Sequence, residues 1–198
     1  MSFHNNLLTL RLFSFERPAL KKEGKTINTH KIENENYDNK YNKSKKIIMS
    51  EHKVNLLWKN ESQDFTYKKF DRTHSWKFEG GTEIMASAAP DYLGKKEFVN
   101  PEEAFAASLA SCHMLTFLAI ASMKKYAVGT YEDDSVAILE KNENSKMTIT
   151  KLYLRPKTSF LGDNIPDEAT IKEMHHSAHE GCFLASAVIT EIIIEPVF

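Results

Sequence analysis

The segment from Ala104 to Met123 constrains the fold most, because it contains no Asp, Glu, Lys or Arg. An uncharged run of this length fits either a membrane-spanning helix or a helix at the centre of a soluble protein. The segment is padded with alanine and contains serine, threonine, cysteine and histidine. A spanning helix would be richer in leucine, isoleucine and valine. We therefore predict a buried central helix and no membrane partner.

The residues on either side of this segment predict where the helix begins and ends. Asn100 is a good N-cap, Pro101 suits the first helical position, and two glutamates follow in the first turn. Lys124 and Lys125 favour the carbonyl end, and Gly129 lies just beyond. The pattern predicts a helix from Pro101 to about Lys125.

Strand-like patterns precede and follow this helix. Apolar residues alternate from Val54 to Trp58, recur in the aromatic run Phe65, Tyr67 and Phe70, and return before the turn at Gly80 and Gly81. This pattern predicts an N-terminal meander of antiparallel strands. Residues 135–139 and 147–154 predict a further hairpin, and residues 188–195 predict a C-terminal strand.

A second helix is predicted to begin at Pro166-Asp167-Glu168 and to end at Gly181. Its inner stripe would contain Ile171, Met174 and Ala178. The chain thus begins with strands and continues with two helices, a hairpin between them and a terminal strand. This order indicates an α+β fold and excludes a doubly wound one.

The first 48 residues differ in composition from the rest. A short apolar start gives way to a tract rich in Asn, Lys and Glu, which cannot build a core. Met49 then opens a segment that resembles the natural start of a domain. We predict a disordered or leader extension over residues 1–48 and one domain over residues 49–198.

Charge and cysteine content narrow the class of protein. Lysine and arginine total 26 against 27 acidic residues, so no broad basic field favours nucleic acid as a partner. The two cysteines, Cys112 and Cys182, are not accompanied by a secretory signal or a CxxC pair. This usage favours the cytoplasm, where thiols are more often reactive, metal-bound or simply buried than joined in a permanent disulfide.

Cys112 lies in the middle of the predicted central helix. A cysteine there is most often a small apolar side chain in a packed core. The helix dipole activates thiols at a helix N-terminus, and this position is too far along the helix for that effect. Any activation of Cys112 must therefore come from a cationic side chain.

Two segments resemble a known family. The sequence NPEEAFAASLASC, ending at Cys112, is similar to the first-cysteine helix of OsmC and Ohr proteins, and HEGCFLASAV around Cys182 resembles their second-cysteine turn. The resemblance covers roughly residues 53–198. It implies the OsmC-like fold, an intertwined homodimer and a thiol-dependent peroxidase, with Cys112 as the peroxidatic and Cys182 as the resolving cysteine.

The resemblance also implies that a glutamate and an arginine prepare the first cysteine. Glu102 matches the glutamate, although an acid in the first turn also simply complements the helix dipole. A straight helix would place Glu102 about 15 Å from Cys112. Either the helix is broken or the site is assembled across a subunit boundary. Arg72, before a strand of the meander, is the preferred arginine over Arg155, which precedes a proline at the end of a strand.

The implied reaction needs no metal and no organic cofactor. Cys112 attacks an organic hydroperoxide, the resulting sulfenic acid condenses with Cys182, and an external dithiol reduces the disulfide. In the family a lipoylated protein or a similar dithiol is the reductant. Apolar neighbours favour a bulky hydroperoxide as substrate, and the same side chains would line any core. They are Phe105, Leu109, Met114, Phe117 and Phe183.

Two positions depart from the family pattern. His113 follows Cys112 where an aromatic or small residue is usual, and Phe183 replaces the proline that typically follows the second cysteine. These departures leave the reductant and the range of substrates open.

Three rival hypotheses stay open, and the histidines suggest two of them. His175 and His179 have the i, i+4 spacing of metal ligands, although most such pairs are solvated helix faces. His74 or His113 could serve as the base of a cysteine hydrolase or acyltransferase, and His113 is a poor partner because adjacent helical residues point about 100° apart. The third alternative is a noncatalytic protein that binds a hydrophobic ligand.

Overall fold

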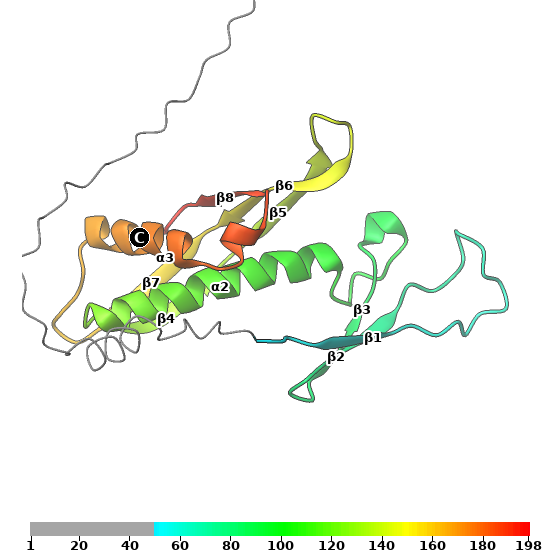
Figure 1. Ribbon diagram of the computed structural model, residues 1–198, viewed down its shortest axis with the longest axis horizontal. Coiled ribbons are helices and arrows are strands. Elements are labelled where there is room, and N and C mark those ends of the chain that lie inside the picture. The colour runs from blue at the N-terminus through cyan, green and yellow to red at the C-terminus, as the bar shows by residue number, and fades with distance from the viewer. Residues whose placement is uncertain (1–49) are drawn as a thin grey trace, which may run out of the picture. The chain divides into compact units, whose positions relative to one another are not determined.

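A computed structural model describes residues 50–198 of the protein. The predicted extension over residues 1–48 lies outside the described residues, so its boundary with the domain stays a prediction. Two helices and eight strands make up most of the described chain, in the order shown in Figure 1. The α+β class predicted from the sequence is confirmed.

The central helix α2 spans Pro101–Met123, as its capping residues predicted. The Asn100 side chain accepts a hydrogen bond from the Glu103 amide at 2.8 Å, and the Glu103 carboxylate accepts one from the Asn100 amide at 3.1 Å. This reciprocal capping box satisfies two N–H groups that the helix start would otherwise leave unpaired. The helix ends at Met123 with Lys124 as its C-cap, and Lys125 just beyond adopts a left-handed φ of 64°. Gly129, expected just beyond the helix, lies inside the next strand.

The strands form three small sheets. The N-terminal sheet pairs β1 (Val54–Leu57), β2 (His74–Phe78) and β3 (Glu83–Ala86) in antiparallel order. A second sheet pairs β4 (Ala127–Asp133) with β7 (Pro156–Leu161). The third contains β5 (Val136–Lys141), β6 (Met147–Leu154) and β8 (Glu191–Ile194). The pair β5–β6 is the predicted hairpin, and β8 joins β6 in parallel.

Three details of the strand prediction were wrong. The aromatic run from Phe65 to Phe70 is a loop and not a strand. The rings of Phe65 and Phe70 pack with that of Trp58 at centroid distances of 5.6 and 6.3 Å. The strands β4 and β7 were missed, because Gly129 and Pro156 suggested interruptions. Gly129 instead lies at a β-bulge between Val128 and Thr130, where glycine is common.

The second helix α3 spans Glu168–Gly181 and begins at Asp167, whose carboxylate accepts a hydrogen bond from the Thr170 amide at 2.8 Å. Its predicted inner stripe of Ile171, Met174 and Ala178 is buried. Gly181 is the last helical residue, as expected. The final strand β8 is shorter than the predicted range 188–195.

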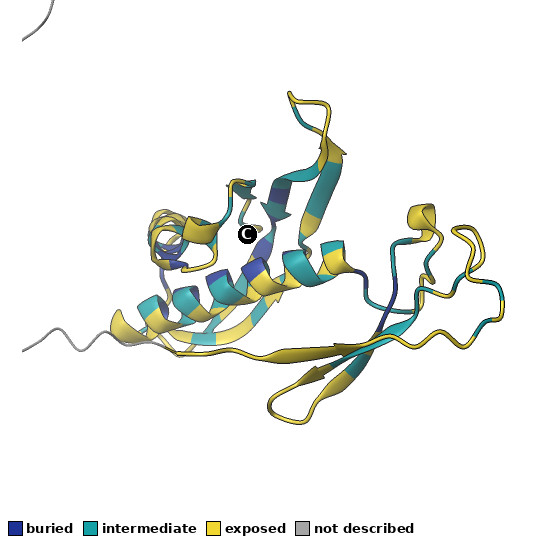
Figure 2. Ribbon diagram, turned by 45° about the vertical axis from the view of Figure 1, so that its right-hand side comes forward, coloured by how far each residue is buried: buried dark blue, intermediate teal, exposed yellow. Residues whose placement is uncertain are grey.

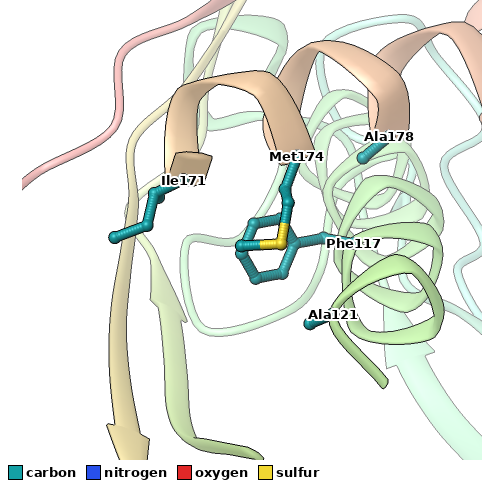
Figure 3. Packing of buried hydrophobic residues seen from close by; sticks show 5 residues of the cluster. All are labelled: Phe117, Ala121, Ile171, Met174 and Ala178. Carbon is teal, nitrogen blue, oxygen red and sulfur yellow. The ribbon is translucent and has the colours of Figure 1, made fainter. Parts of the chain in front are cut away.

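Two hydrophobic clusters meet along one stripe of α2. Its buried residues recur every three or four positions, at Ala106, Leu109, His113, Phe117 and Ala121. The first pair packs against Leu152 and Leu154 of β6, whereas the last pair packs against α3. Figure 3 shows Met174 of α3 and Phe117 of α2 pointing toward each other. The helix therefore holds α3 on one half and the β5–β6–β8 sheet on the other.

The opposite side of α2 is open. By length and composition the helix could span a membrane, and 28% of its most apolar 18-residue stretch is buried. It packs against α3, β4, β5 and β6, so it is the core helix of this fold. Leu115 and Met123 on the open side are 61% and 75% exposed. Figure 2 shows that exposure also dominates the N-terminal sheet. Apolar surface thus remains uncovered in one chain.

Candidate active site

The fold brings the two cysteines into contact. Cys112 lies midway along α2, and Cys182 is the C-cap residue of α3. The Cys182 Sγ–H donates to Cys112 Sγ, and the two sulfur atoms are 2.7 Å apart. Both thiols are free. Since a disulfide requires a separation of about 2.05 Å, a small shift of one helix end joins the two sulfurs.

The two thiols differ in accessibility. Cys112 is half-buried, whereas the Cys182 side chain is buried. Burial raises the pKa of the Cys182 thiol, and the hydrogen bond to Cys112 raises it further. Cys182 is thus held as a protonated thiol behind its partner. An incoming molecule meets Cys112 first.

Close packing fixes the crossing of α3 over α2 next to the thiols. A side chain at Gly181 would meet the Thr116 methyl group at 3.1 Å. The Thr116 hydroxyl donates to the Cys112 carbonyl oxygen at 2.9 Å, which ties its side chain to α2. A small residue directly before Cys182 therefore allows the C-terminal end of α3 to approach the cysteine of α2.

Beside the thiols lies a buried pair of histidines. His113 Nε2 and His175 Nδ1 are 3.0 Å apart, so one ring donates a hydrogen bond to the other. The rings are stacked within 7° of parallel, and Phe117 stacks on His175 at a centroid distance of 4.2 Å. Their exposed fractions are 1% and 2%. This pair joins α2 to α3, as the cysteines do.

The histidine pair is neutral at ordinary pH. Burial lowers the pKa of His113 to about 4 and that of His175 to about 3, because charged imidazole loses its hydration in the core. The outer nitrogens, His113 Nδ1 and His175 Nε2, are buried without a hydrogen-bond partner among the described residues. Such atoms are uncommon in folded proteins and call for a physical reason.

The charged residues of the predicted site are not brought together within one chain. The Arg72 guanidinium donates to the carbonyl oxygens of Phe70 and Tyr67 at 3.0 and 2.8 Å and lies over the Phe70 ring at 4.0 Å. Glu102, on the first turn of α2, has a buried Oε2 without a partner among residues 50–198. Because α2 is continuous between Glu102 and Cys112, the helix is not broken. The other alternative, assembly across a subunit boundary, stays a prediction.

The region around Glu102 is hollow. A cavity of about 720 Å³ is lined by Glu102, Asp133 and Ser135, among others. Asp133 Oδ2 and Ser135 Oγ are also buried without partners in the described chain. Burial raises the pKa of the Asp133 carboxyl group. The cavity can therefore accept a hydrogen-bond donor or a cation.

The remaining polar candidates have other partners. Arg155 pairs with Glu195 at 3.1 Å, and His74 Nδ1 lies 2.9 Å from the Arg72 carbonyl oxygen. His175 faces His113 rather than His179, and no group of three or more metal-binding side chains gathers among residues 50–198. The arrangement around Cys112 thus offers a second thiol, and not a histidine base, as its nearest reactive group.

The apolar residues predicted around Cys112 divide into two groups. Leu109 and Phe117 are fully buried in the core. Phe105 and Met114 are half-buried, and Phe183 is 86% exposed beside Cys182. Phe105 packs against the cluster with Leu152 and Leu154, whereas Phe183, next to Cys182 in the chain, is exposed enough to contact an apolar molecule.

The histidine pair was missed from the sequence although a signal was present. His175 falls within the stripe of Ile171, Met174 and Ala178, and His113 lies four residues from both Leu109 and Phe117. Both histidines therefore occupy core positions by helical spacing. The sequence interpretation treated them as a base and as a metal ligand.

Comparison with known proteins gives one family and many solved structures. The family model described as "OsmC-like protein" matches residues 94–196. An OsmC-like protein of unknown function from Vibrio cholerae is 45% identical, and the match covers 75% of this chain and 100% of that one with a TM-score of 0.73. No curated protein matches the chain.

More distant structures share the fold. An OsmC-like protein from Mycoplasma pneumoniae is 14% identical, with a TM-score of 0.60 over 76% of this chain and 98% of that one. The organic hydroperoxide resistance protein OhrB of Bacillus subtilis is 19% identical, with a TM-score of 0.56 over 75% and 98% of the two chains.

Proposed function

This chain belongs to the OsmC-like protein family, and on that premise we propose that it is a thiol-dependent peroxidase that reduces organic hydroperoxides to alcohols. The contact between Cys112 and Cys182 is the observation that carries the proposal. Two free thiols this close form a disulfide once either is oxidised. Solved relatives with the same fold include proteins titled organic hydroperoxide resistance proteins.

The reaction follows from the different exposure of the two sulfurs. The Cys112 sulfur attacks the terminal peroxide oxygen, the O–O bond breaks, and the alcohol leaves with a proton. Cys112 is then a sulfenic acid. The Cys182 sulfur attacks the Cys112 sulfur, hydroxide leaves, and the thiol proton completes a water molecule. An external dithiol reduces the resulting disulfide and returns both thiols.

We further propose that the working form is a homodimer. Glu102 Oε2 is buried without a partner among the described residues, while Arg72 lies on a different part of the chain. The open side of α2 and the N-terminal sheet expose large apolar side chains, including Leu56 at 57% and Leu115 at 61%. A second copy would cover this surface and could bring its own Arg72 and Glu102 to Cys112 of this chain. The guanidinium, held by the carboxylate, would then stabilise the Cys112 thiolate.

The same proposal places the protein in the cytoplasm, in the response to oxidative stress. Free thiols in contact persist where the compartment is reducing. The reductant is a dithiol, because its two sulfurs resolve the mixed disulfide without a further reactant.

Peroxide consumption tests this function. Purified protein is supplied with cumene or tert-butyl hydroperoxide and a dithiol, and loss of peroxide is followed. We expect turnover by the wild type, loss of turnover in C112S, and at most one oxidation per chain in C182S. Chelator should leave the rate unchanged. Assays with thioester or ester substrates run in parallel.

The variants separate this function from its alternatives. A cysteine hydrolase or acyltransferase would act on the ester substrates and would keep its activity in C182S. A protein that only binds a hydrophobic ligand would consume no peroxide with any dithiol. Either result from folded wild-type protein would overturn the proposal.

A further inference from the structure

The buried histidines and the thiols join the same two helices. His113 follows Cys112 on α2, and His175 lies on α3, which ends at Cys182. From His175 to Cys182 is about two helical turns, so both side chains lie on the face of α3 that meets α2. The position of Cys182 thus depends on how α3 is docked.

The turn after Cys182 holds that residue locally. The Ser186 amide donates to the Cys182 carbonyl oxygen at 3.3 Å, and the amides of Leu184 and Ala185 donate to its sulfur. These bonds lie within the turn, whereas the docking of α3 sets how far the turn lies from α2. The apolar contacts of α3 through Ile171, Met174 and Ala178 are not directional, whereas the hydrogen bond between His113 and His175 has a fixed length and angle.

The histidine pair is an unfavourable choice for stability alone. Two polar nitrogens stay buried without partners in the described chain. Each such atom loses its hydration without replacement, so apolar side chains of similar volume would suit the core better. A buried polar contact with this cost can instead specify one arrangement of the packed elements.

We propose that His113 and His175 are positioning residues, whose hydrogen bond docks α3 so that Cys182 stays within reach of Cys112. The inference rests on the proposed peroxidase function and assigns the histidines to its second step. Condensation of the Cys112 sulfenic acid with the Cys182 thiol forms the S–S bond, breaks the S–O bond and releases water. The first oxidation, at Cys112 alone, does not require α3 to be docked.

The test compares two double variants with matched geometry. In H113L/H175L the side chains have similar volume and no hydrogen bond. In H113Q/H175N the amide groups can occupy the positions of Nε2 and Nδ1 and restore a polar bond. His176, which is exposed and pairs with Glu180 at 3.5 Å, gives the control H176L on the same helix. Circular dichroism and thermal unfolding establish that each protein is folded.

Rapid mixing with cumene hydroperoxide separates the two steps. Intact mass after quenching gives the rates of sulfenic acid formation and of disulfide formation. We expect the first rate to stay within about twofold in every variant, and the second to fall about 10- to 100-fold in H113L/H175L, the size of a misplacement near 1 Å. H113Q/H175N should recover most of this loss. H176L should match the wild type.

A peroxide-free oxidant makes the inference independent of the proposed function. Diamide accepts two electrons and two protons from a pair of thiols and forms the same disulfide. If the wild type ignores peroxide but its oxidation by diamide depends on the histidines, only the peroxidase proposal fails. A folded H113L/H175L that forms the disulfide at the wild-type rate with both oxidants overturns the role of the histidines.

An equilibrium readout covers the case in which the leucine double variant does not fold. The single variant H175L then replaces it, with H175N as its polar match. Thiol–disulfide equilibrium with dithiothreitol should show a disulfide that is about tenfold easier to reduce in H175L than in H175N, a shift of about 30 mV in potential. Equal potentials would contradict the proposal.

Discussion

The two halves of α2 lie in different surroundings. The C-terminal half packs against α3, where Phe117, Ala121 and Met174 are fully buried and the two sulfurs touch. At the N-terminal end of the helix, the N-terminal sheet is largely exposed and Glu102 has a buried oxygen without a partner in the described chain. One chain therefore completes the thiol pair but not the charged part of the site.

This difference separates two requirements of the reaction. Joining the sulfurs depends on contacts within one chain, and these are present. In the proposed reaction a cation activates Cys112, and within this chain the Arg72 guanidinium is bonded to its own loop. The proposed second copy of the chain would supply the missing contact.

The largest effect should come from the core between α2 and α3. We expect F117A to lower the free energy of unfolding by about 3–5 kcal/mol, because it leaves a cavity where the ring contacts His175, Tyr131 and the α3 stripe. Denaturant titration measures this loss. It should not depend on protein concentration, since these contacts lie within one chain.

Phe78 provides the matched substitution in the N-terminal sheet. Its side chain is 39% exposed on β2. We expect F78A to cost about 1 kcal/mol or less in dilute protein and more as concentration rises, because a partner copy would bury this surface. Equal and concentration-independent losses in F78A and F117A would remove the distinction between the N-terminal sheet and the core between α2 and α3.

The next effect concerns Arg72, the proposed cation beside Cys112. We expect R72A to slow the first oxidation of Cys112 about 100-fold, comparable to the loss of one charge-stabilising donor in other enzymes. Mixing R72A chains with C112S chains should restore part of the activity, since a mixed dimer can contain one site with both Cys112 and Arg72. Stopped-flow thiol consumption follows the recovery.

One outcome would count against a shared site. No recovery in a mixture that demonstrably exchanges subunits would place Arg72 and Cys112 in the same chain or remove Arg72 from the reaction. For the partner carboxylate, E102Q should slow the first oxidation, whereas E103Q should not, because glutamine preserves the capping box.

The smallest effect is a pH dependence of stability from the histidine pair. Their folded pKa values of about 4 and 3 lie below the unfolded value of 6.5, so the unfolded chain binds more protons between these limits. The free energy of unfolding does not depend on the protonation of these rings above pH 6.5, and it decreases as the pH falls below that value. The expected slope is at most about 1.4 kcal/mol per pH unit for each ring.

Denaturant titration at several pH values isolates this slope. Asp133, whose pKa burial raises, acts in the opposite direction, so the wild type is compared with H113L/H175L, which retains Asp133. The difference in stability between the two proteins should be constant above pH 6.5 and should shift in favour of H113L/H175L as the pH falls below it. Parallel curves across the acidic range would show that the rings do not change their protonation with unfolding.

Local sequence signals predicted the long elements of the fold. The uncharged run with Asn100 and Pro101 before it located α2, and the stripe of Ile171, Met174 and Ala178 located α3. The strands β4 and β7 were missed because Gly129 and Pro156 weaken the local strand pattern. These strands form because they pair with each other, and they are distant in the sequence. The aromatic run after Trp58 forms a cluster in a loop, which hydrophobic spacing alone does not distinguish from a strand.

The site was predictable only in part. Segments that resemble the family gave Cys112, Cys182 and Glu102 as candidates, and the structure shows that the two cysteines are in contact. Neither spacing nor composition gives a distance between residues 70 positions apart. The histidine pair depends on the crossing of α3 over α2, a tertiary feature. The hydrogen-bond partners of the Arg72 guanidinium depend on the conformation of its own loop and on any second chain. Neither can be derived from one sequence.

A single titration tests the central claim that Cys112 and Cys182 react as a pair within one chain. Reduced protein is treated with one equivalent of cumene hydroperoxide, and intact mass is measured under denaturing conditions. The account predicts chains lighter by two hydrogen atoms, with both thiols lost together. Folded protein that keeps both thiols, or that gains a stable oxygen at Cys112 without forming the internal disulfide, would contradict it.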